Sequence, residues 1–265
     1  MKPLAVDLYC GLGGWSEALL AEGWDVVGFD IERHQYGEEK YPAQLVLQDV
    51  LTLHGSQFRD AALIVASPPC QEFSYMSMPW SKAKAKERDL LEGRDDPKRL
   101  TALFDACFRI QREACEAAGR HIPLVVENVR GAQKWVGRSR WNFGSFHLWG
   151  DVPALMPIGK AIKVTTMGAG WYPPGHPKHV PGLGFNTHSE RGIKGVPHRP
   201  DGHWTNPDEN GIKQGGDWFN SSQPSISRLY GSKSLARKCA SAMIAKIPLE
   251  LSRHIARVYR PEARC

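Results

Sequence analysis

Short apolar runs alternate with amphipathic stretches through the first half of the chain. The apolar runs predict β-strands at 4–8, 24–29, 45–47, 62–66 and 122–126. Before the last run, apolar residues recur at helical spacing from Leu100 to Phe108, and the pattern ends at Gly119, which predicts a long helix after Pro97. Strands that alternate with helices are typical of a Rossmann-like α/β domain, a mostly parallel sheet with helices on both faces.

The second half of the chain has a different composition and pattern. Residues 151–227 are rich in Gly, Pro, His and Asn, which favours short strands and ordered loops. Helical spacing returns at 235–246 and 249–259, with a break at Pro248. We therefore expect a first domain at 1–150, a small loop-rich lobe at 151–227, and C-terminal helices at 228–265 that pack back on the first domain.

Composition narrows the class of protein. The 265 residues carry a net charge of +6, which is compatible with a polyanionic partner. No apolar stretch is long enough to cross a membrane and no signal peptide opens the sequence, so we expect a cytoplasmic protein without a membrane partner. The six cysteines show no Cys-x-x-Cys pairing and read as reduced thiols, and the irregular histidines of the lobe predict no metal site.

Polar and glycine residues gather where the predicted strands end. In open α/β sheets, ligands bind outside the carboxyl ends of the strands. The first strand leads into a glycine loop at 7–14, and Asp30 follows the second strand, nineteen positions after Gly11, where an acid can bind a ribose. The loop lacks the Gly-x-Gly-x-x-Gly spacing of a pyrophosphate site, which favours a nucleoside cofactor without phosphates over a nicotinamide dinucleotide.

Two further strand ends carry reactive groups. Cys70 follows the fourth strand behind Pro68 and Pro69, which fix the backbone, and Glu127 follows the fifth. From the residues alone, Cys70 is either a structural thiol or a nucleophile, and Glu127 is either a local cap or a group that faces the cleft. Cys107 and Cys115 lie on or beside the apolar stripe of the long helix and are expected to be packing residues.

Four short motifs follow one another within roughly residues 4–150: the loop at 7–14, Pro69-Cys70-Gln71, Glu127-Asn128-Val129 and Arg138-Ser139-Arg140. These motifs and their order resemble those of the cytosine-5 DNA methyltransferases of compact, phage or bacterial type. The resemblance implies the Rossmann-like S-adenosylmethionine-dependent methyltransferase fold, with catalytic and cofactor-binding residues in 1–150 and target recognition in 151–227. It also implies a monomer that acts on double-stranded DNA in a bacterial or phage-infected cell, and it leaves a partner restriction endonuclease open.

The resemblance also implies roles for single residues. Cys70 would attack carbon 6 of a flipped cytosine, Glu127 would hold the ring, and Arg138 and Arg140 would contact the base carbonyl. Contacts with S-adenosylmethionine, and with the product S-adenosylhomocysteine, would come from Asp7, Leu8, Tyr9, Cys10, Gly11, Gly13, Gly14, Asp30, Ile31, Asp49, Pro69 and Leu100. DNA contacts would come from Gln71, Ser74, Lys82, Lys84, Lys86 and Arg88.

The sequence departs from the family pattern at two places. The stretch 244–248 lacks the usual Gly-Asn-x-Val, so no site residue is assigned there, and the glutamine that usually precedes the two arginines is not in its place. Three alternatives stay open at this point. They are a tRNA cytosine-5 methyltransferase, a catalytically silent nucleic-acid-binding relative, and a nicotinamide oxidoreductase.

Overall fold

A seven-stranded sheet forms the centre of the computed structural model, which describes residues 2–36, 39–70, 73, 85, 88–90, 92–94, 96–156, 238–239, 242 and 245–261. The strand order is β5-β2-β1-β6-β7-β9-β8. The first five in this order are β5 (Gln44–Leu47), β2 (Asp25–Asp30), β1 (Leu4–Leu8), β6 (Leu63–Ala66) and β7 (Leu124–Asn128), and they run parallel to one another. The predicted α/β class is confirmed.

Two antiparallel strands extend the sheet beyond β7. β9 (Phe146–Gly150) pairs with β7, and β8 (Trp141–Phe143) pairs with β9. The sequence did not reveal this hairpin, because four of the five β9 residues are buried and show no alternation between polar and apolar. A separate two-stranded sheet joins β3 (Gln35–Tyr36) to β4 (Glu39–Lys40).

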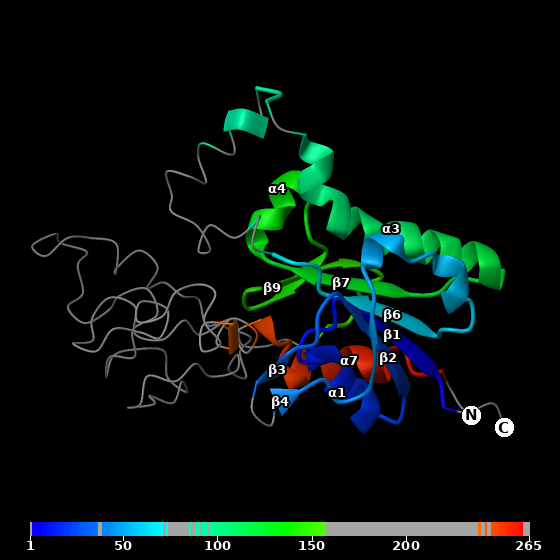
Figure 1. Cartoon of the computed structure of the whole chain (residues 1–265). Helices are drawn as coiled ribbons and strands as arrows, with labels where there is room; N and C mark the ends of the chain where they lie inside the picture. Colours follow the sequence, from blue (N-terminus) through cyan, green and yellow to red (C-terminus); the bar gives the residue numbers. More distant parts are fainter. Residues whose placement is uncertain are drawn as a thin grey trace, which may run out of the picture. The chain divides into compact units, whose positions relative to one another are not determined.

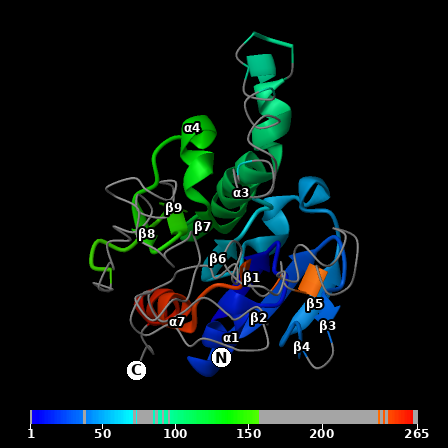
Figure 2. The same cartoon turned by 90° about the vertical axis from the view of Figure 1, so that its left-hand side faces the viewer.

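Helices cover both faces of the sheet (Figures 1 and 2). Helix α3 (Pro97–Ala118) lies on one face, whereas α1 (Gly14–Ala21) and α7 (Leu249–Val258) lie on the other. Shorter elements complete the domain: η1 (Val50–Thr52), η2 (Gly55–Phe58), η3 (Arg130–Ala132) and α4 (Gln133–Val136). No helix among the described residues combines the length and apolar character that a membrane crossing requires.

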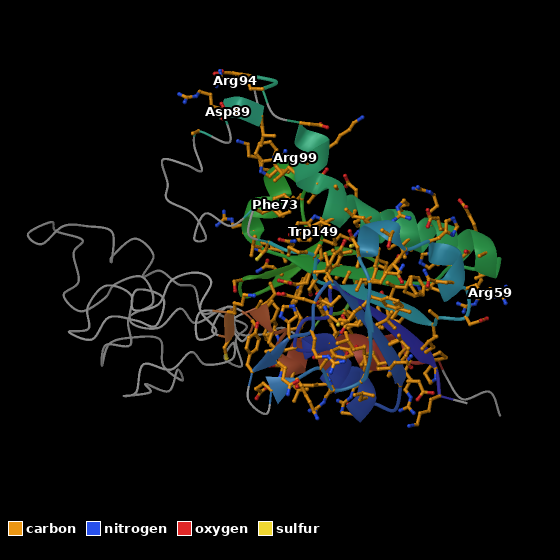
Figure 3. All side chains as sticks on the ribbon, viewed as in Figure 1. Arg59, Phe73, Asp89, Arg94, Arg99 and Trp149 are labelled. Atoms are coloured by element: carbon orange, nitrogen blue, oxygen red, sulfur yellow. The ribbon has the colours of Figure 1, made fainter. Side chains whose placement is uncertain are left out.

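Local signals explain the bounds of α3. The Asp96 side chain accepts a hydrogen bond from the Lys98 backbone N–H, Pro97 occupies the first turn, and Gly119 ends the helix with a φ of 62°. The apolar stripe of α3 then packs on the sheet, and the side chains of this layer, Trp149 of β9 among them, fill the space beneath the helix (Figure 3). The predicted helix is therefore confirmed.

The predicted strand at 122–126 was placed two residues too early. β7 spans Leu124–Asn128, because Pro123 has no N–H to donate to a strand ladder. As a consequence, Glu127 and Asn128 are the last two residues of the strand instead of the loop after it. The other predicted strands agree with the structure within one residue at each end.

The domain boundaries stay a prediction. The chain divides into one compact unit of residues 1–157 with 249–265, and another of residues 158–248. Most of the lobe at 151–227 lies outside the described residues, as does most of the predicted helix at 235–246. The predicted helix at 249–259 is confirmed as α7.

Candidate active site

The carboxyl ends of the five parallel strands meet at one edge of the sheet. In register, Leu8 lies beside both Phe29 and Ala66, and Asp30 lies beside Leu47. The chain runs from β1 outward through β2 to β5, and then returns to β6 on the other side of β1. This reversal of strand order between β1 and β6 is the position where open α/β sheets bind ligands.

The glycine loop after β1 has a constrained backbone. Tyr9 takes a positive φ of 57°, rare for a residue with a side chain, and its hydroxyl donates to the Leu103 carbonyl of α3 at 2.9 Å. A Cβ on Gly11 would meet no atom within 4 Å, whereas a Cβ on Gly13 would lie 2.4 Å from Pro42. Gly11 therefore leaves open space beside the backbone, and Gly13 permits the backbone to pack closely against Pro42.

Asp30 holds this loop against the end of β2. Its carboxylate accepts hydrogen bonds from the backbone N–H of Gly11 at 2.9 Å and of Ile31 at 2.8 Å, and His34 Nε2 lies 3.6 Å away. Burial alone raises the pKa of this carboxyl, but the bonds from His34 and the backbone outweigh it and hold the pKa below its ordinary value. Asp30 is therefore ionised at neutral pH, next to the 73% exposed Ile31.

A buried chain of hydroxyls supports the loop from below. Ser16 Oγ donates to Asp7 Oδ2 at 2.6 Å, and it accepts from the Tyr41 hydroxyl at 2.7 Å. Burial raises the pKa of Asp7 well above its ordinary value, and its Oδ1 has no partner among the described residues. The side chains of Asp7 and Leu8 are fully buried beneath the loop. Their contacts with the cofactor stay a prediction.

The loop after β6 carries Cys70 and is fastened on both sides. Ser67 Oγ accepts from Trp15 Nε1 at 3.0 Å, which joins this loop to the start of α1. The Pro68 carbonyl accepts from Asn128 Nδ2 at 3.0 Å, which joins it to the end of β7. Cys70 itself is half-buried at the sheet edge.

Burial separates the cysteines of the described chain. Cys10 and Cys107 are buried, and burial raises the pKa of each thiol far above its ordinary value, which makes both poor nucleophiles. Cys115 is half-buried and accepts from the Ile122 backbone N–H at 3.2 Å, in keeping with a packing role. Of the four cysteines between Cys10 and Cys115, Cys70 alone combines partial exposure with a position at the carboxyl edge of the sheet.

Glu127 and Arg140 lie on opposite sides of β9, each beside Leu148. Glu127 is 4% exposed near the end of β7 and pairs in register with Leu148 of β9. The Arg140 backbone N–H donates to the Leu148 carbonyl at 2.8 Å, while the side chains of Arg138 and Arg140 are exposed. The structure thus brings the glutamate and the two arginines to the same part of the sheet.

The other predicted site residues have mixed positions. Asp49 caps η1 by accepting from the Leu51 backbone N–H at 2.9 Å, and Leu100, on the apolar stripe of α3, is buried in the core. Pro69 and Arg88 are exposed, and Cys10, Gly13 and Gly14 are buried within the glycine loop. The predicted DNA contacts Gln71, Ser74, Lys82, Lys84 and Lys86 lie outside the described residues.

Comparison with known proteins agrees with this geometry. A family model of C-5 cytosine-specific DNA methylases matches residues 4–134, which contain the glycine loop, Asp30, Cys70 and Glu127. Through these residues the chain belongs to that family. No curated protein sequence matches the chain.

Solved structures similar to this methylase-family chain include three methyltransferases. One is described as a DNA modification methyltransferase encoded within an Escherichia coli prophage (22% identity, TM-score 0.34, covering 49% of this chain and 33% of that one). A second is EhMeth of Entamoeba histolytica (13% identity, TM-score 0.33, covering 52% of this chain and 41% of that one). The third is Dnmt2 of S. pombe (17% identity, TM-score 0.30, covering 50% of this chain and 36% of that one). The matched part thus spans about a third to two fifths of these longer chains.

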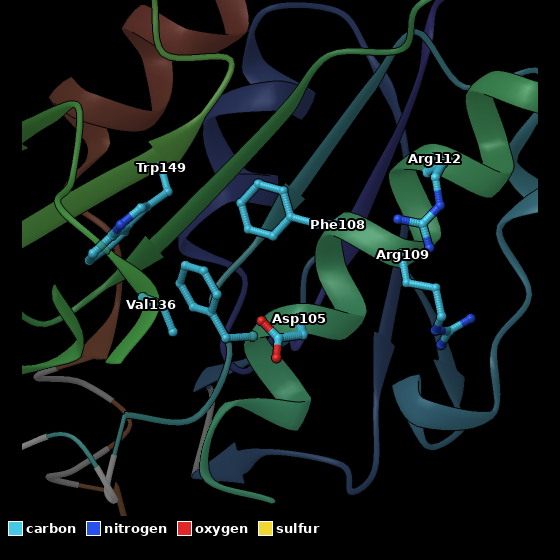
Figure 4. A pocket seen from close by; sticks show the side chains of 7 residues that line it. Asp105, Phe108, Arg109, Arg112, Val136 and Trp149 are labelled. Atoms are coloured by element: carbon cyan, nitrogen blue, oxygen red, sulfur yellow. The ribbon is translucent and has the colours of Figure 1, made fainter. Parts of the chain in front are cut away.

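A groove of about 430 Å³ lies elsewhere on this methylase-family domain, along α3 (Figure 4). Its wall includes Phe108 and Trp149, and its rim carries Asp105 and Arg109. Asp105 accepts from Thr101, and Arg109 bonds to Glu113 within the same helix. These two charged side chains therefore already have hydrogen-bond partners within α3. The strand ends, which carry Cys70 and Glu127, remain the candidate active site.

The sequence missed the residues that fasten the methylase loops to one another. Asn128 stood inside a recognised motif but received no role, although a polar residue that closes an apolar strand must find a hydrogen-bond partner when buried. Ser67, Trp15 and Tyr41 gave no local signal, because their partners lie far away in sequence.

Proposed function

We propose that the chain transfers a methyl group from S-adenosylmethionine to carbon 5 of cytosine in double-stranded DNA. The observation that carries this proposal is the hydrogen bond from Asn128 to the Pro68 carbonyl. It ties the loop of the half-buried Cys70 to β7, the strand that carries Glu127, within a domain that matches the C-5 cytosine-specific DNA methylase family. A thiol in the loop after β6 and a carboxyl group on the neighbouring strand β7 are the two groups that the chemistry requires.

The residues around the glycine loop fit S-adenosylmethionine. The ionised Asp30 has oxygen lone pairs left to accept from ribose hydroxyls, and the open space above Gly11 lets a ligand approach the backbone. Exposed apolar side chains at the ends of β2 and β5, Ile31 and Leu47, suit the flat face of an adenine. When bound, the cofactor would supply an electrophilic methyl group on its sulfonium centre.

The chain's own residues prepare the cytosine. Carbon 5 is a poor nucleophile until the Cys70 thiolate bonds to carbon 6 and the electrons of the 5,6 double bond move to carbon 5. Glu127 donates a proton to the ring nitrogen as the charge develops, and Arg138 and Arg140 bind the base carbonyl. After methylation, carbon 5 loses its proton to a base, the carbon–sulfur bond breaks, and the ring nitrogen returns its proton to the Glu127 carboxylate. These steps restore the ring, the thiolate and the carboxyl group. The target base must leave the helix stack to reach Cys70.

Bisulfite sequencing of plasmid from expressing cells tests the proposal. We expect methylcytosine in a fixed sequence context with the wild type, none with Cys70→Ala, and wild-type levels with the matched control Cys115→Ala. Equal methylation by the wild type and Cys70→Ala would rule out Cys70 as the nucleophile.

The substrate is tested separately with purified protein and a radiolabelled methyl donor. Incorporation into duplex DNA and not into tRNA is the expected result. Incorporation into tRNA alone would favour an RNA methyltransferase. Cofactor binding by calorimetry without transfer to either nucleic acid would favour a silent binding protein.

A further inference from the structure

The backbone between α4 and β8 is fastened to β9 at two points. The Gly137 carbonyl accepts from Trp149 Nε1 at 2.9 Å, and the Arg140 backbone N–H donates to the Leu148 carbonyl at 2.8 Å. Between these anchors lies Ser139, half-buried, whereas the arginines on either side of it are exposed. The side chain of Ser139 therefore points inward while its two neighbours reach the surface.

Ser139 is the centre of a hydrogen-bonded cluster with Gln133 and His147, which we call the Ser139 cluster. Gln133 Oε1 of α4 accepts from both the Ser139 backbone N–H at 3.1 Å and the Ser139 hydroxyl at 3.2 Å. Ser139 Oγ also lies 3.0 Å from His147 Nδ1 of β9. One serine thus joins a helix, a loop and a strand.

The direction of each hydrogen bond follows from a single backbone group. Because the Ser139 N–H can only donate, Gln133 must present its carbonyl oxygen, and its amide nitrogen then reaches the Arg130 carbonyl at 3.4 Å. The only proton of the Ser139 hydroxyl is used toward Gln133, so the hydroxyl must accept from His147. His147 therefore carries a proton on Nδ1.

The cluster connects the exposed arginines to the strand of the candidate active site. His147 pairs in register with Asn128 of β7, and the next pair joins Leu148 to Glu127. His147 is 9% exposed, so its ring is held in a mostly buried place on the strand beside Glu127. A change at Ser139 therefore acts on the segment that orients both arginines.

We propose that Gln133, Ser139 and His147 are positioning residues that hold Arg138 and Arg140 in the orientation needed to bind the target cytosine. This inference rests on the proposed methyl transfer to DNA. The three residues act through the arginines and make no contact with the base themselves. Their loss should lower turnover on DNA and leave cofactor binding unchanged.

Steady-state kinetics on a duplex oligonucleotide test this role with paired variants. Ser139→Ala removes both hydrogen bonds of the Ser139 hydroxyl, and His147→Leu removes the one between His147 and Ser139. We expect kcat/KM for DNA to fall about 3- to 10-fold in each variant. His147→Asn keeps an N–H donor near the position of Nδ1 and should recover most of the activity. Ser252→Ala removes a buried hydroxyl in α7 that donates to the Leu249 carbonyl, and it serves as the matched control.

The outcomes separate the positioning role from a general loss of structure. The KM for S-adenosylmethionine should match the wild type in Ser139→Ala and His147→Asn, and both variants should remain fully folded at the assay temperature. Wild-type kcat/KM in Ser139→Ala, or equal losses in His147→Leu and His147→Asn, would overturn the inference while the methyl transfer of the wild type stands. A wild-type chain without methyl transfer to DNA would instead overturn the proposed function, and this inference with it.

Discussion

Replacing Asn128 by aspartate probes how β7 holds the cysteine loop. The Asn128 side chain donates from Nδ2 to the Pro68 carbonyl at 3.0 Å and accepts from the Val129 backbone N–H at 2.8 Å. An aspartate of the same shape keeps the acceptor toward Val129 but turns a second oxygen toward the Pro68 carbonyl. Two acceptors then face each other at a side chain that is only 1% exposed.

The size and the pH dependence of the effect follow from this geometry. A buried carbonyl without its donor, opposite a buried carboxylate, should lower the free energy of unfolding by about 2–4 kcal/mol at pH 7. Burial raises the pKa of the new carboxyl in the folded state, and its protonated form can again donate to Pro68. The deficit of Asn128→Asp is therefore full above the folded-state pKa and disappears as the pH falls toward the unfolded value of about 3.9.

Urea unfolding between pH 4.5 and 8, followed by tryptophan fluorescence, measures this deficit, and methyl transfer at pH 7 should fall with it. Asn142→Asp is the matched control, because exposed Asn142 also donates to a carbonyl, that of Gly144 at 3.1 Å. Water replaces the lost partner there, so we expect a change below about 0.5 kcal/mol. An Asn128→Asp variant as stable as the wild type at pH 7, or a deficit equal at every pH, would refute the reasoning.

Two more predictions concern the support of the domain. Gly28→Ala would place a methyl group 2.3 Å from the Tyr41 ring and should lower the free energy of unfolding, measured in urea, by about 1–3 kcal/mol. The double variant Gly28→Ala with Tyr41→Leu should recover stability. A single variant as stable as the wild type would contradict this prediction. A hydrogen bond from Arg257 holds the pKa of Glu22 below its ordinary value of 4.5, so the contribution of Glu22 is present above that pH and lost as the pH falls through the folded pKa. Unfolding curves of the wild type and Glu22→Gln should therefore differ at pH 7 and converge toward pH 3, and a constant gap would show that the ion pair is not its source.

The sequence predicted the strands whose burial is continuous. β6 and β7 are buried on both faces, so each is an uninterrupted apolar run that ends in polar residues. Because parallel strands share a carboxyl edge, the residues after each run could be predicted to converge, and Asp30 and Cys70 do lie at that edge. Long-helix periodicity and caps predicted α3 equally well.

Contacts between distant residues were beyond the sequence. The Asp7–Ser16–Tyr41 chain and the Ser139 cluster depend on side chains that meet only after the sheet and its hairpin have formed. Nothing local distinguishes these serines from surface serines, since a hydroxyl is compatible with either environment. The burial of Asp7 and its hydrogen bond to Ser16 could not be predicted for the same reason.

Helix α7 closes over α1 from the far end of the chain. Trp24 Nε1 donates to the Ala256 carbonyl at 3.1 Å, across a separation of 232 residues. During synthesis on the ribosome, the apolar side of α1 stays exposed until α7, more than two hundred residues later, has been made and can pack on it. A nascent intermediate of this protein would therefore expose that side to chaperones, and completion of the domain would be a late event, set by when α7 emerges from the exit tunnel.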